Sequence, residues 1–302
     1  MIKFQLIILG NNAATPLLNR NTSSQILNIN DNLFLIDCGE GTQVQLMKYS
    51  IKINKIKCIF ISHLHGDHYF GLMGLLCGFN LNNRVNPLII YGPDELDTII
   101  SFNFKCSGTK LKYQLIFYKL NNFNNILFRN DDVTISKIAL KHNIPCNGFL
   151  FKENILYKNI RKDKIKQYNM TINEIKEVKK GNCLIKNNNL ISNEELTFSN
   201  HTNRSYAYCT DTLPDESIID KIYGINTLYH ETTFMHNMKN RAFKTYHTTT
   251  IQAGLIAKKS NVGKLIIGHF SSRYHNLNYL LKECQEIFKN TYLGIEGHIF
   301  TI

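Results

Sequence analysis

Apolar residues recur in the first half of the chain in short runs that predict β-strands. These runs cover residues 3–9, 25–29, 33–36, 58–62, 88–91, 114–118 and 133–140. Apolar residues at helical spacing predict helices over 42–49, 69–79 and 250–259, and the last of these follows threonines suited to capping a helix. Strands mixed with helices indicate an α/β fold, and the meander-like succession of strands argues against a purely parallel sheet.

The length and the lack of linkers favour a single domain. A chain of 302 residues could hold two ordinary domains or one large α/β domain. No Pro-, Gly- or Ser-rich linker and no internal repeat divides it, so we expect one domain over residues 1–302. No uninterrupted apolar stretch approaches the roughly 18 residues of a membrane-spanning helix, and we expect no membrane partner.

Eight cysteines lie far apart in the sequence, at positions 38, 58, 77, 106, 146, 183, 209 and 284. No two of them have the C-x-x-C spacing of a zinc finger or of a thioredoxin-like redox site. We therefore expect buried or free thiols in a reducing compartment, and a cytoplasmic protein.

The charge of the chain favours an anionic partner. Its 35 Lys and Arg residues and 23 Asp and Glu residues give a net charge of +12, which attracts nucleic acid, anionic membranes or acidic substrates. Half of this excess lies between residues 152 and 186, where ten basic residues occur with four acidic ones. The segment has little strand periodicity, so we expect residues 152–200 to form an insertion that projects from the core. A plain solvated surface is the usual meaning of such a run.

The strongest chemical signal directly follows the expected strand at 58–62. His63, His65, Asp67 and His68 place four metal-competent side chains within six positions. A spacing of two puts His63 and His65 on the same side of an extended chain, and Asp67 and His68 then fall on the following turn. Imidazole and carboxylate groups at this density suit zinc or a related divalent cation. Surface or hydrogen-bonded core histidines are the alternative, which fits a lone histidine better than this cluster.

Three further candidate ligands follow other strand-like runs. His142 comes after the run at 133–140, Asp211 after the run at 206–209, and His269 after the run at 265–268. Each of them alone is explained almost as well by a structural role. Together with the cluster they complete a site for two cations, but spacing alone does not show which cation each residue would serve.

The pattern His63-x-His65-x-Asp67-His68, with a later His, Asp and His, resembles the metallo-β-lactamase superfamily. Further motifs resemble its tRNA 3′-processing branch, ribonuclease Z. They occur in the order of that family, and they lie at residues 10–16, 20–24, 37–43, 210–212, 230–234 and 268–274. The last two are the most specific, because the histidine cluster alone is shared by lactamases, thioesterases, phosphodiesterases and redox enzymes.

The resemblance implies an αββα sandwich with two zinc ions per subunit at one edge of its sheets. One zinc ion would be held by His63, His65 and His142, the other by Asp67, His68 and His269, with Asp211 bridging them. Histidine and aspartate also accept other divalent metals such as manganese or iron.

The resemblance further implies an endoribonuclease that removes 3′ trailers from precursor tRNA. A hydroxide would attack the phosphorus after the discriminator nucleotide and leave a 3′-hydroxyl on the tRNA. Asp67 would orient or deprotonate the water, and His247 paired with Glu231 would protonate the departing 3′-oxygen. His230 is expected to support the site. An ordinary residue at the start of a helix is the alternative for His247.

Substrate contacts are expected at two places. Ser271 and Arg273 follow His269, where the guanidinium could bind a phosphate bidentately, although a structural turn explains these two residues equally well. Ribonuclease Z enzymes carry an arm for the tRNA elbow where residues 152–200 stand, and its expected phosphate contacts are Lys158, Arg161, Lys162, Lys164 and Lys166. The Gly-Pro-rich motif of this arm is absent, and residues 168–173 stand in its place. The family also implies a homodimer, in which the arm of one subunit serves the active site of the other.

Two other functions remain open at this point. A dinuclear zinc phosphodiesterase or esterase for small molecules could use the same core, but it would not need a basic arm. A non-catalytic RNA-binding or structural member would have lost ligands, whereas all seven are present here.

Overall fold

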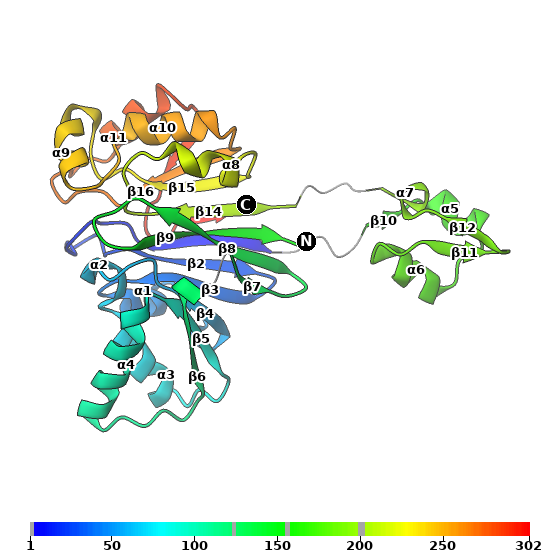
Figure 1. Ribbon diagram of the computed structural model, residues 1–302, viewed down its shortest axis with the longest axis horizontal. Coiled ribbons are helices and arrows are strands. Elements are labelled where there is room, and N and C mark those ends of the chain that lie inside the picture. Colours follow the sequence, from blue (N-terminus) through cyan, green and yellow to red (C-terminus); the bar gives the residue numbers. More distant parts are fainter. Residues whose placement is uncertain (1–2, 123–124, 155–157, 199–202) are drawn as a thin grey trace.

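Two seven-stranded sheets form the centre of the computed structural model, which describes residues 3–122, 125–154, 158–198 and 203–302 (Figure 1). The first sheet has the order β18-β1-β2-β3-β4-β5-β6. Its strands are β1 (Phe4–Gly10), β2 (Ser24–Ile29), β3 (Asn32–Cys38), β4 (Ile56–Phe60), β5 (Leu88–Gly92), β6 (Leu115–Lys119) and β18 (Ile299–Thr301). Strands β1 to β3 form an antiparallel meander, whereas β3 to β6 run parallel.

The second sheet likewise combines an antiparallel meander with parallel strands, and its strand order is β17-β16-β15-β14-β9-β8-β7. Its strands are β7 (Ile126–Arg129), β8 (Val133–Leu140), β9 (Cys146–Glu153), β14 (Ser205–Cys209), β15 (Thr227–Glu231), β16 (Lys264–Gly268) and β17 (Thr291–Leu293). Strands β7 to β9 are antiparallel and β14 to β17 are parallel. The expected departure from a purely parallel sheet is confirmed.

Helices cover the outer face of each sheet (Figure 1). On the first sheet these are α1 (Thr42–Lys48), α3 (Leu72–Leu81) and α4 (Asp94–Ser107). On the second they are α8 (Ile219–Ile222), α10 (Thr250–Lys259) and α11 (Asn278–Gln285). The short helices α2 (Gly66–Tyr69) and α9 (Lys239–Lys244) lie in the connections that follow β4 and β15. The α/β fold expected from the residue pattern, and the αββα sandwich implied by the family resemblance, are therefore confirmed.

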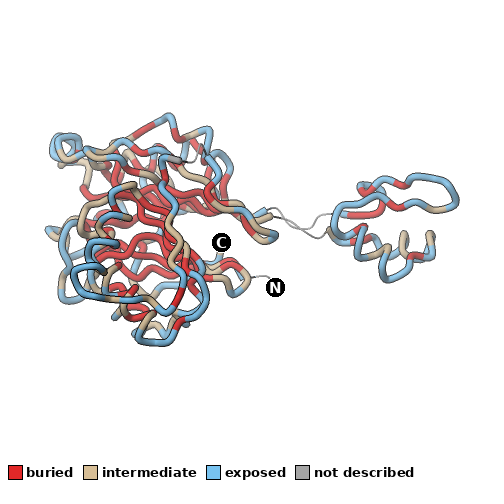
Figure 2. The backbone as a smooth tube through the Cα atoms, turned by 60° about the horizontal axis from the view of Figure 1, so that its bottom comes forward, coloured by how far each residue is buried: buried red, intermediate tan, exposed pale blue. Residues whose placement is uncertain are grey.

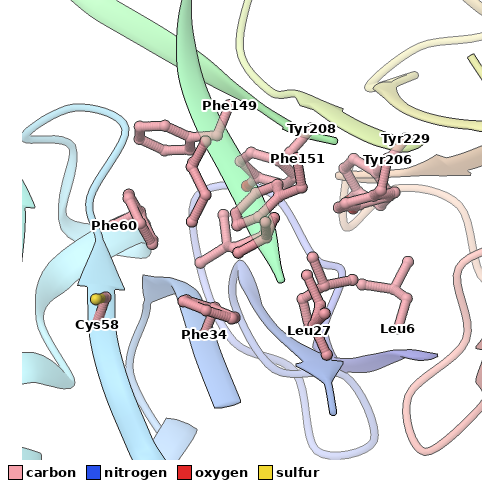
Figure 3. Packing of buried hydrophobic residues seen from close by; sticks show 14 of the residues in the cluster. Leu6, Leu27, Phe34, Cys58, Phe60, Phe149, Phe151, Tyr206, Tyr208 and Tyr229 are labelled. Atoms are coloured by element: carbon pink, nitrogen blue, oxygen red, sulfur yellow. The ribbon is translucent and has the colours of Figure 1, made fainter. Parts of the chain in front are cut away.

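The alternation of side chains along each strand separates the inner core from the two outer layers. Phe34, Phe60, Phe149, Phe151 and Tyr208 meet between the two sheets, where they pack in tilted, edge-on and stacked pairs with their neighbours (Figure 3). The intervening residues of the same strands face the helices, because successive side chains of a strand point to opposite faces. Most of the buried residues accordingly lie in the sandwich (Figure 2).

The expected helix at 69–79 is wrong as a single element. The structure has α2 and α3 there, with Phe70 and Gly71 between them. The amide of Gly71 donates to the carbonyl of Cys38 at 2.9 Å instead of continuing the helical series. A Cβ atom at Gly71 would lie 2.2 Å from the carbonyl oxygen of Gly39, so only glycine allows this approach. The break between α2 and α3 keeps the loop after β3 close to residues 63–68, which we call the histidine-rich turn.

Residues 158–198, which we call the arm, form a separate unit (Figure 1). Its elements are β10 (Asn159–Ile160), α5 (Lys162–Gln167), α6 (Ile172–Lys179), β11 (Leu184–Lys186), β12 (Asn189–Ile191), α7 (Asn193–Leu196) and β13 (Thr197–Phe198). A small core of its own is built from Ile160, Met170, Val178, Leu184, Ile191 and Leu196. Lys152, which the charge pattern groups with this segment, lies in β9 and pairs with Thr134 and Ser205. Residues 155–157 and 199–200 of the expected insertion lie outside the described residues.

All eight cysteines are free thiols, five of them buried: Cys38, Cys58, Cys146, Cys209 and Cys284. Among the described helices, none has the length and apolar content needed to cross a membrane.

Replacing Phe34 by alanine tests the inner core. Phe34 is fully buried and packs against Phe60, Phe128 and Phe151. We expect Phe34→Ala to lower the free energy of unfolding by about 3–5 kcal/mol in a urea titration. The same change at Phe102, which is 67% exposed on α4, should leave it nearly unchanged. Equal losses in both variants would contradict this description of the core.

Candidate metal centre and active-site cleft

The candidate ligands gather where strands of both sheets end. His63 and His65 follow β4, His142 follows β8, Asp211 follows β14, and His269 follows β16. The carboxyl ends of neighbouring parallel strands meet at one edge, where side chains on the following loops can converge. The structure brings all seven expected ligands together there, with Asp67 and His68 on α2. We call His63, His65, Asp67, His68, His142, Asp211 and His269 the metal cluster.

One half of the metal cluster surrounds Oδ2 of Asp211. His63 Nε2 lies 3.6 Å and His142 Nε2 3.7 Å from this oxygen. His65 Nδ1 lies 3.1 Å from both of these ring nitrogens. One ligand atom from each of the four residues therefore lies within 4.8 Å of the others.

The other half surrounds Oδ1 of the same carboxylate. His269 Nε2 lies 3.1 Å and His68 Nε2 3.4 Å from this oxygen. Asp67 completes the group, since its Oδ2 lies 3.3 Å from His269 Nε2 and 3.5 Å from His68 Nε2. Asp211, which is 2% exposed, thus presents a different oxygen to each half.

This donor set fits divalent cations. Ligands of a tetrahedral zinc ion at about 2.0–2.1 Å lie about 3.3 Å from one another, close to the separations in both halves. His68 Nε2 is buried without a hydrogen-bond partner among the described residues, an arrangement that a cation would satisfy. Burial lowers the pKa of His63 and His142, which favours the neutral imidazole that binds metals.

Asp37 at the end of β3 holds the metal cluster in place, although it is not one of the expected ligands. It is fully buried and adopts a left-handed backbone conformation with φ 55°. Its carboxylate accepts hydrogen bonds from His68 Nδ1 at 2.7 Å, from the Tyr208 hydroxyl at 2.7 Å and from both the amide and the hydroxyl of Ser62. A proton held on His68 Nδ1 leaves Nε2 free for a cation.

The ring nitrogens on the far side of other cluster histidines are held in a similar way. His142 Nδ1 donates to the Tyr246 carbonyl at 3.1 Å. His269 Nδ1 lies 2.9 Å from the Thr233 hydroxyl. These contacts orient the imidazole rings with Nε2 toward Asp211.

Glu231 and His247 form a pair beside the metal cluster. Glu231 ends β15, is fully buried, and accepts hydrogen bonds from His247 Nδ1 at 3.0 Å and from the amides of Thr212, Thr233 and Thr248. Burial disfavours the charged imidazole of His247, but the Glu231 carboxylate outweighs this and raises its pKa to about 9. The carboxylate thus favours the charged form of the His247 imidazole, and Nε2 of this ring is not engaged by Glu231.

His230, the residue before Glu231, is fully buried and bonds through Nδ1 to the Glu231 carbonyl at 2.8 Å. His230 thus helps to hold the backbone of Glu231 in position.

A cleft of about 690 Å³ opens over these groups and is lined by His65, Asp67, Asp211, His247 and His269. We call it the active-site cleft.

Ser271 and Arg273 also line the active-site cleft. Arg273 Nε donates to the Ser271 hydroxyl at 3.0 Å, and its guanidinium lies 5.1 Å from the centre of the Phe234 ring. Sequence reasoning missed three lining residues: Phe70, which is 64% exposed, Arg241 on α9, and Thr245. An aromatic residue or a cation near a motif is too common for sequence alone to single it out.

The five basic residues expected to contact tRNA all lie in the arm and not in the active-site cleft. Lys164 pairs with Glu195 at 3.0 Å, and the Arg161 guanidinium lies 5.8 Å from the centre of the Phe198 ring. Lys162 and Lys166 are exposed on α5, and Lys158 donates its amide to the Lys179 carbonyl at the start of the arm.

Known proteins resemble this chain along nearly its whole length. A ribonuclease Z of Bacteroides fragilis (strain YCH46) is 40% identical over 98% of this chain and 98% of its own length. A ribonuclease Z of Cytophaga hutchinsonii is 44% identical over 99% of this chain and 96% of its own. The crystal structure of the short form of human tRNase Z has a TM-score of 0.72 at 25% identity and covers 99% of both chains.

Two further similarities are to a solved structure and to a family model. YhfI of Bacillus subtilis, a metallo-β-lactamase fold protein, has a TM-score of 0.71 at 18% identity and covers 99% of both chains. The family model described as Anti-Pycsar protein Apyc1 matches residues 4–177, a range that ends inside the arm. The chain fits that family model over this range, and the full-length relatives show that it belongs to the ribonuclease Z family.

Proposed function

We propose that this protein is a metal-dependent endoribonuclease that removes 3′ trailers from precursor tRNA by hydrolysing the phosphodiester after the discriminator nucleotide. The observation that carries the proposal is the division of the metal cluster by the two oxygens of Asp211, with His247 beside it in the same cleft. The similarity to ribonuclease Z and tRNase Z proteins supports tRNA as the substrate.

In this proposal the metal cluster holds two zinc ions per subunit. His63, His65 and His142 would hold one ion and Asp67, His68 and His269 the other, with Asp211 shared between the two groups. Manganese or iron would suit the same ligands. Bound divalent cations would supply a hydroxide near neutral pH and offset the negative charge of the phosphate.

Asp67 acts on the attacking water, and His247 acts on the departing 3′-oxygen. The Ala14 amide donates to Asp67 Oδ2 at 2.8 Å, which fixes a carboxylate able to orient or deprotonate the attacking water. As the bond from this water oxygen to phosphorus forms, the bond from phosphorus to the 3′-oxygen breaks. His247 gives its Nε2 proton to that oxygen, so the tRNA ends in a 3′-hydroxyl and the trailer begins with a 5′-phosphate. Glu231 keeps the imidazole charged and oriented.

Ser271 and Arg273 bind a phosphate of the RNA at the mouth of the cleft. Arg273 is exposed there and is positioned by Ser271 and Phe234, so its guanidinium can hold two phosphate oxygens.

The arm binds the tRNA elbow through phosphates. Nine basic and five acidic residues between 158 and 198 give it a net charge of +4. Lys158, Arg161, Lys162, Lys164 and Lys166 supply the contacts in this proposal, and the exposed Lys162 and Lys166 are the freest to do so. A hydrolase of small esters could use the same cleft but has no need of such a surface.

We also propose a cytoplasmic homodimer. Val44 and Met47 lie three positions apart on α1 and are 61% and 64% exposed, which leaves an apolar surface suited to a second copy. Eight free thiols agree with a reducing compartment.

Cleavage of a 3′-extended precursor tRNA by the zinc-loaded protein tests the function. We expect a single cut after the discriminator nucleotide. Asp67→Ala should lower kcat/KM at least about a hundredfold, because it removes the group that orients the water. Asp220→Ala, an exposed aspartate on α8, is the matched control and should be fully active.

A small phosphodiester, assayed beside the tRNA, separates the two substrate classes. The double variant Lys162→Ala/Lys166→Ala should weaken tRNA cleavage and reduce its salt dependence, but leave the small substrate unaffected. Hydrolysis of the small phosphodiester with the tRNA left intact would refute the tRNA assignment.

The pH dependence of kcat tests the Glu231 and His247 pair. A general acid works in its protonated form, so activity is present below the pKa of His247 and is lost as pH rises through it. Glu231→Gln removes the charge that raises this pKa, and we expect the alkaline limb to move to lower pH by roughly one unit or more. Glu40→Gln removes an exposed charge from the same cleft and should leave the limb in place. An unmoved limb in Glu231→Gln would exclude His247 as the acid.

A further inference from the structure

A second hollow, of about 280 Å³, opens beside His247. We call it the α9 pocket, because Lys239, Phe243 and Lys244 of α9 line it together with Gln252 of α10. No residue of the metal cluster lines it, whereas His247 lines both the α9 pocket and the active-site cleft. His247 thus borders both.

Helix α9 contributes basic side chains to both the α9 pocket and the active-site cleft. Lys239 and Lys244 line the α9 pocket, and Arg241 lines the active-site cleft. Among the described residues, no carboxylate forms an ion pair with any of these three. Phe243 is 69% exposed in the pocket, between the two lysines in sequence. Unpaired cations around an exposed aromatic ring suit a ligand that has both a phosphate and a base.

The proposed chemistry at His247 indicates which nucleotide of the RNA would occupy the α9 pocket. In an in-line displacement, the attacking and leaving oxygens lie on opposite sides of phosphorus. His247 Nδ1 is held by Glu231, so the proton for the leaving oxygen comes from Nε2. That leaving oxygen is the 3′-oxygen of the nucleotide on the 5′ side of the cut. Its ribose therefore lies on the His247 side of the scissile phosphate, where the α9 pocket opens.

The size of the α9 pocket agrees with one nucleotide. Pockets for small ligands begin at roughly 300 Å³, so about 280 Å³ admits one base with its ribose but no duplex end.

We propose that the α9 pocket binds the nucleotide on the 5′ side of the scissile phosphate, with its base on Phe243 and its own 5′-phosphate at Lys239 and Lys244. This inference rests on the proposed function. It also sets the direction of the RNA: the tRNA body approaches past α9, and the trailer leaves on the side of the cleft lined by Phe70.

Substrates that lack one phosphate charge test the assignment. A methylphosphonate is placed either at the 5′-phosphate of the discriminator or one linkage downstream of the cut, and kcat/KM is measured for the wild type and for Lys239→Ala/Lys244→Ala. We expect the double variant to lose roughly tenfold on the unmodified precursor, because a charged hydrogen bond is removed. On the substrate whose upstream phosphate is neutral, the double variant and the wild type should have nearly equal kcat/KM. On the substrate whose downstream phosphate is neutral, kcat/KM of the double variant should again be roughly tenfold lower than that of the wild type.

A matched control removes two positive charges elsewhere. Lys258 on α10 and Lys282 on α11 are exposed, and Lys258→Ala/Lys282→Ala should behave like the wild type on all three substrates. Thermal unfolding verifies that each variant is folded.

An abasic discriminator tests the aromatic contact separately. The wild type should lose roughly tenfold on the abasic precursor, whereas Phe243→Ala should cleave the abasic and normal precursors at equal rates. Coupling of the lysines to the downstream phosphate, or no coupling to either, would overturn the inference while the proposed function stands. Failure of the wild type to cut the unmodified precursor would overturn the proposed function and this inference with it.

Discussion

The site depends on a buried carboxylate that faces imidazoles on both sides. Asp211 is 2% exposed, and its two oxygens are directed at different pairs of histidines. A charged group in such surroundings is stable only when opposite charge or hydrogen bonds compensate for the lost water. The two cations of the proposed site, one at each oxygen, would provide that compensation.

The fold supplies this geometry because both sheets contribute strand ends to one edge. β3 and β4 of the first sheet bring Asp37 and the histidine-rich turn, and β14, β15 and β16 of the second bring Asp211, Glu231 and His269. Tyr208, from β14, reaches across the inner core to the Asp37 carboxylate. The packing between the sheets and the position of the ligands are therefore coupled.

Much of this arrangement could be predicted from local pattern. A histidine cluster directly after an apolar strand, and single His and Asp residues after others, indicate one shared site, because the carboxyl ends of strands that run in the same direction lie at one edge of a sheet. The contacts of Asp37 and the pocket at α9 could not be found in this way. The partners of Asp37 come from the loop after β4, from helix α2 and from β14 of the other sheet. Lys239 and Lys244 look like ordinary surface charges until the pocket beside His247 is known. Likewise, Gly71 interrupts the expected helix through a contact with residues more than 30 positions earlier in the chain.

Anomalous diffraction at the zinc edge, from crystals of the zinc-loaded protein, tests most directly whether Asp211 joins two metal sites. We predict two peaks roughly 3.5–4 Å apart, one beside Oδ2 with His63, His65 and His142 and the other beside Oδ1 with Asp67, His68 and His269. A single peak, or two peaks of which neither contacts Asp211, would contradict the division of the metal cluster.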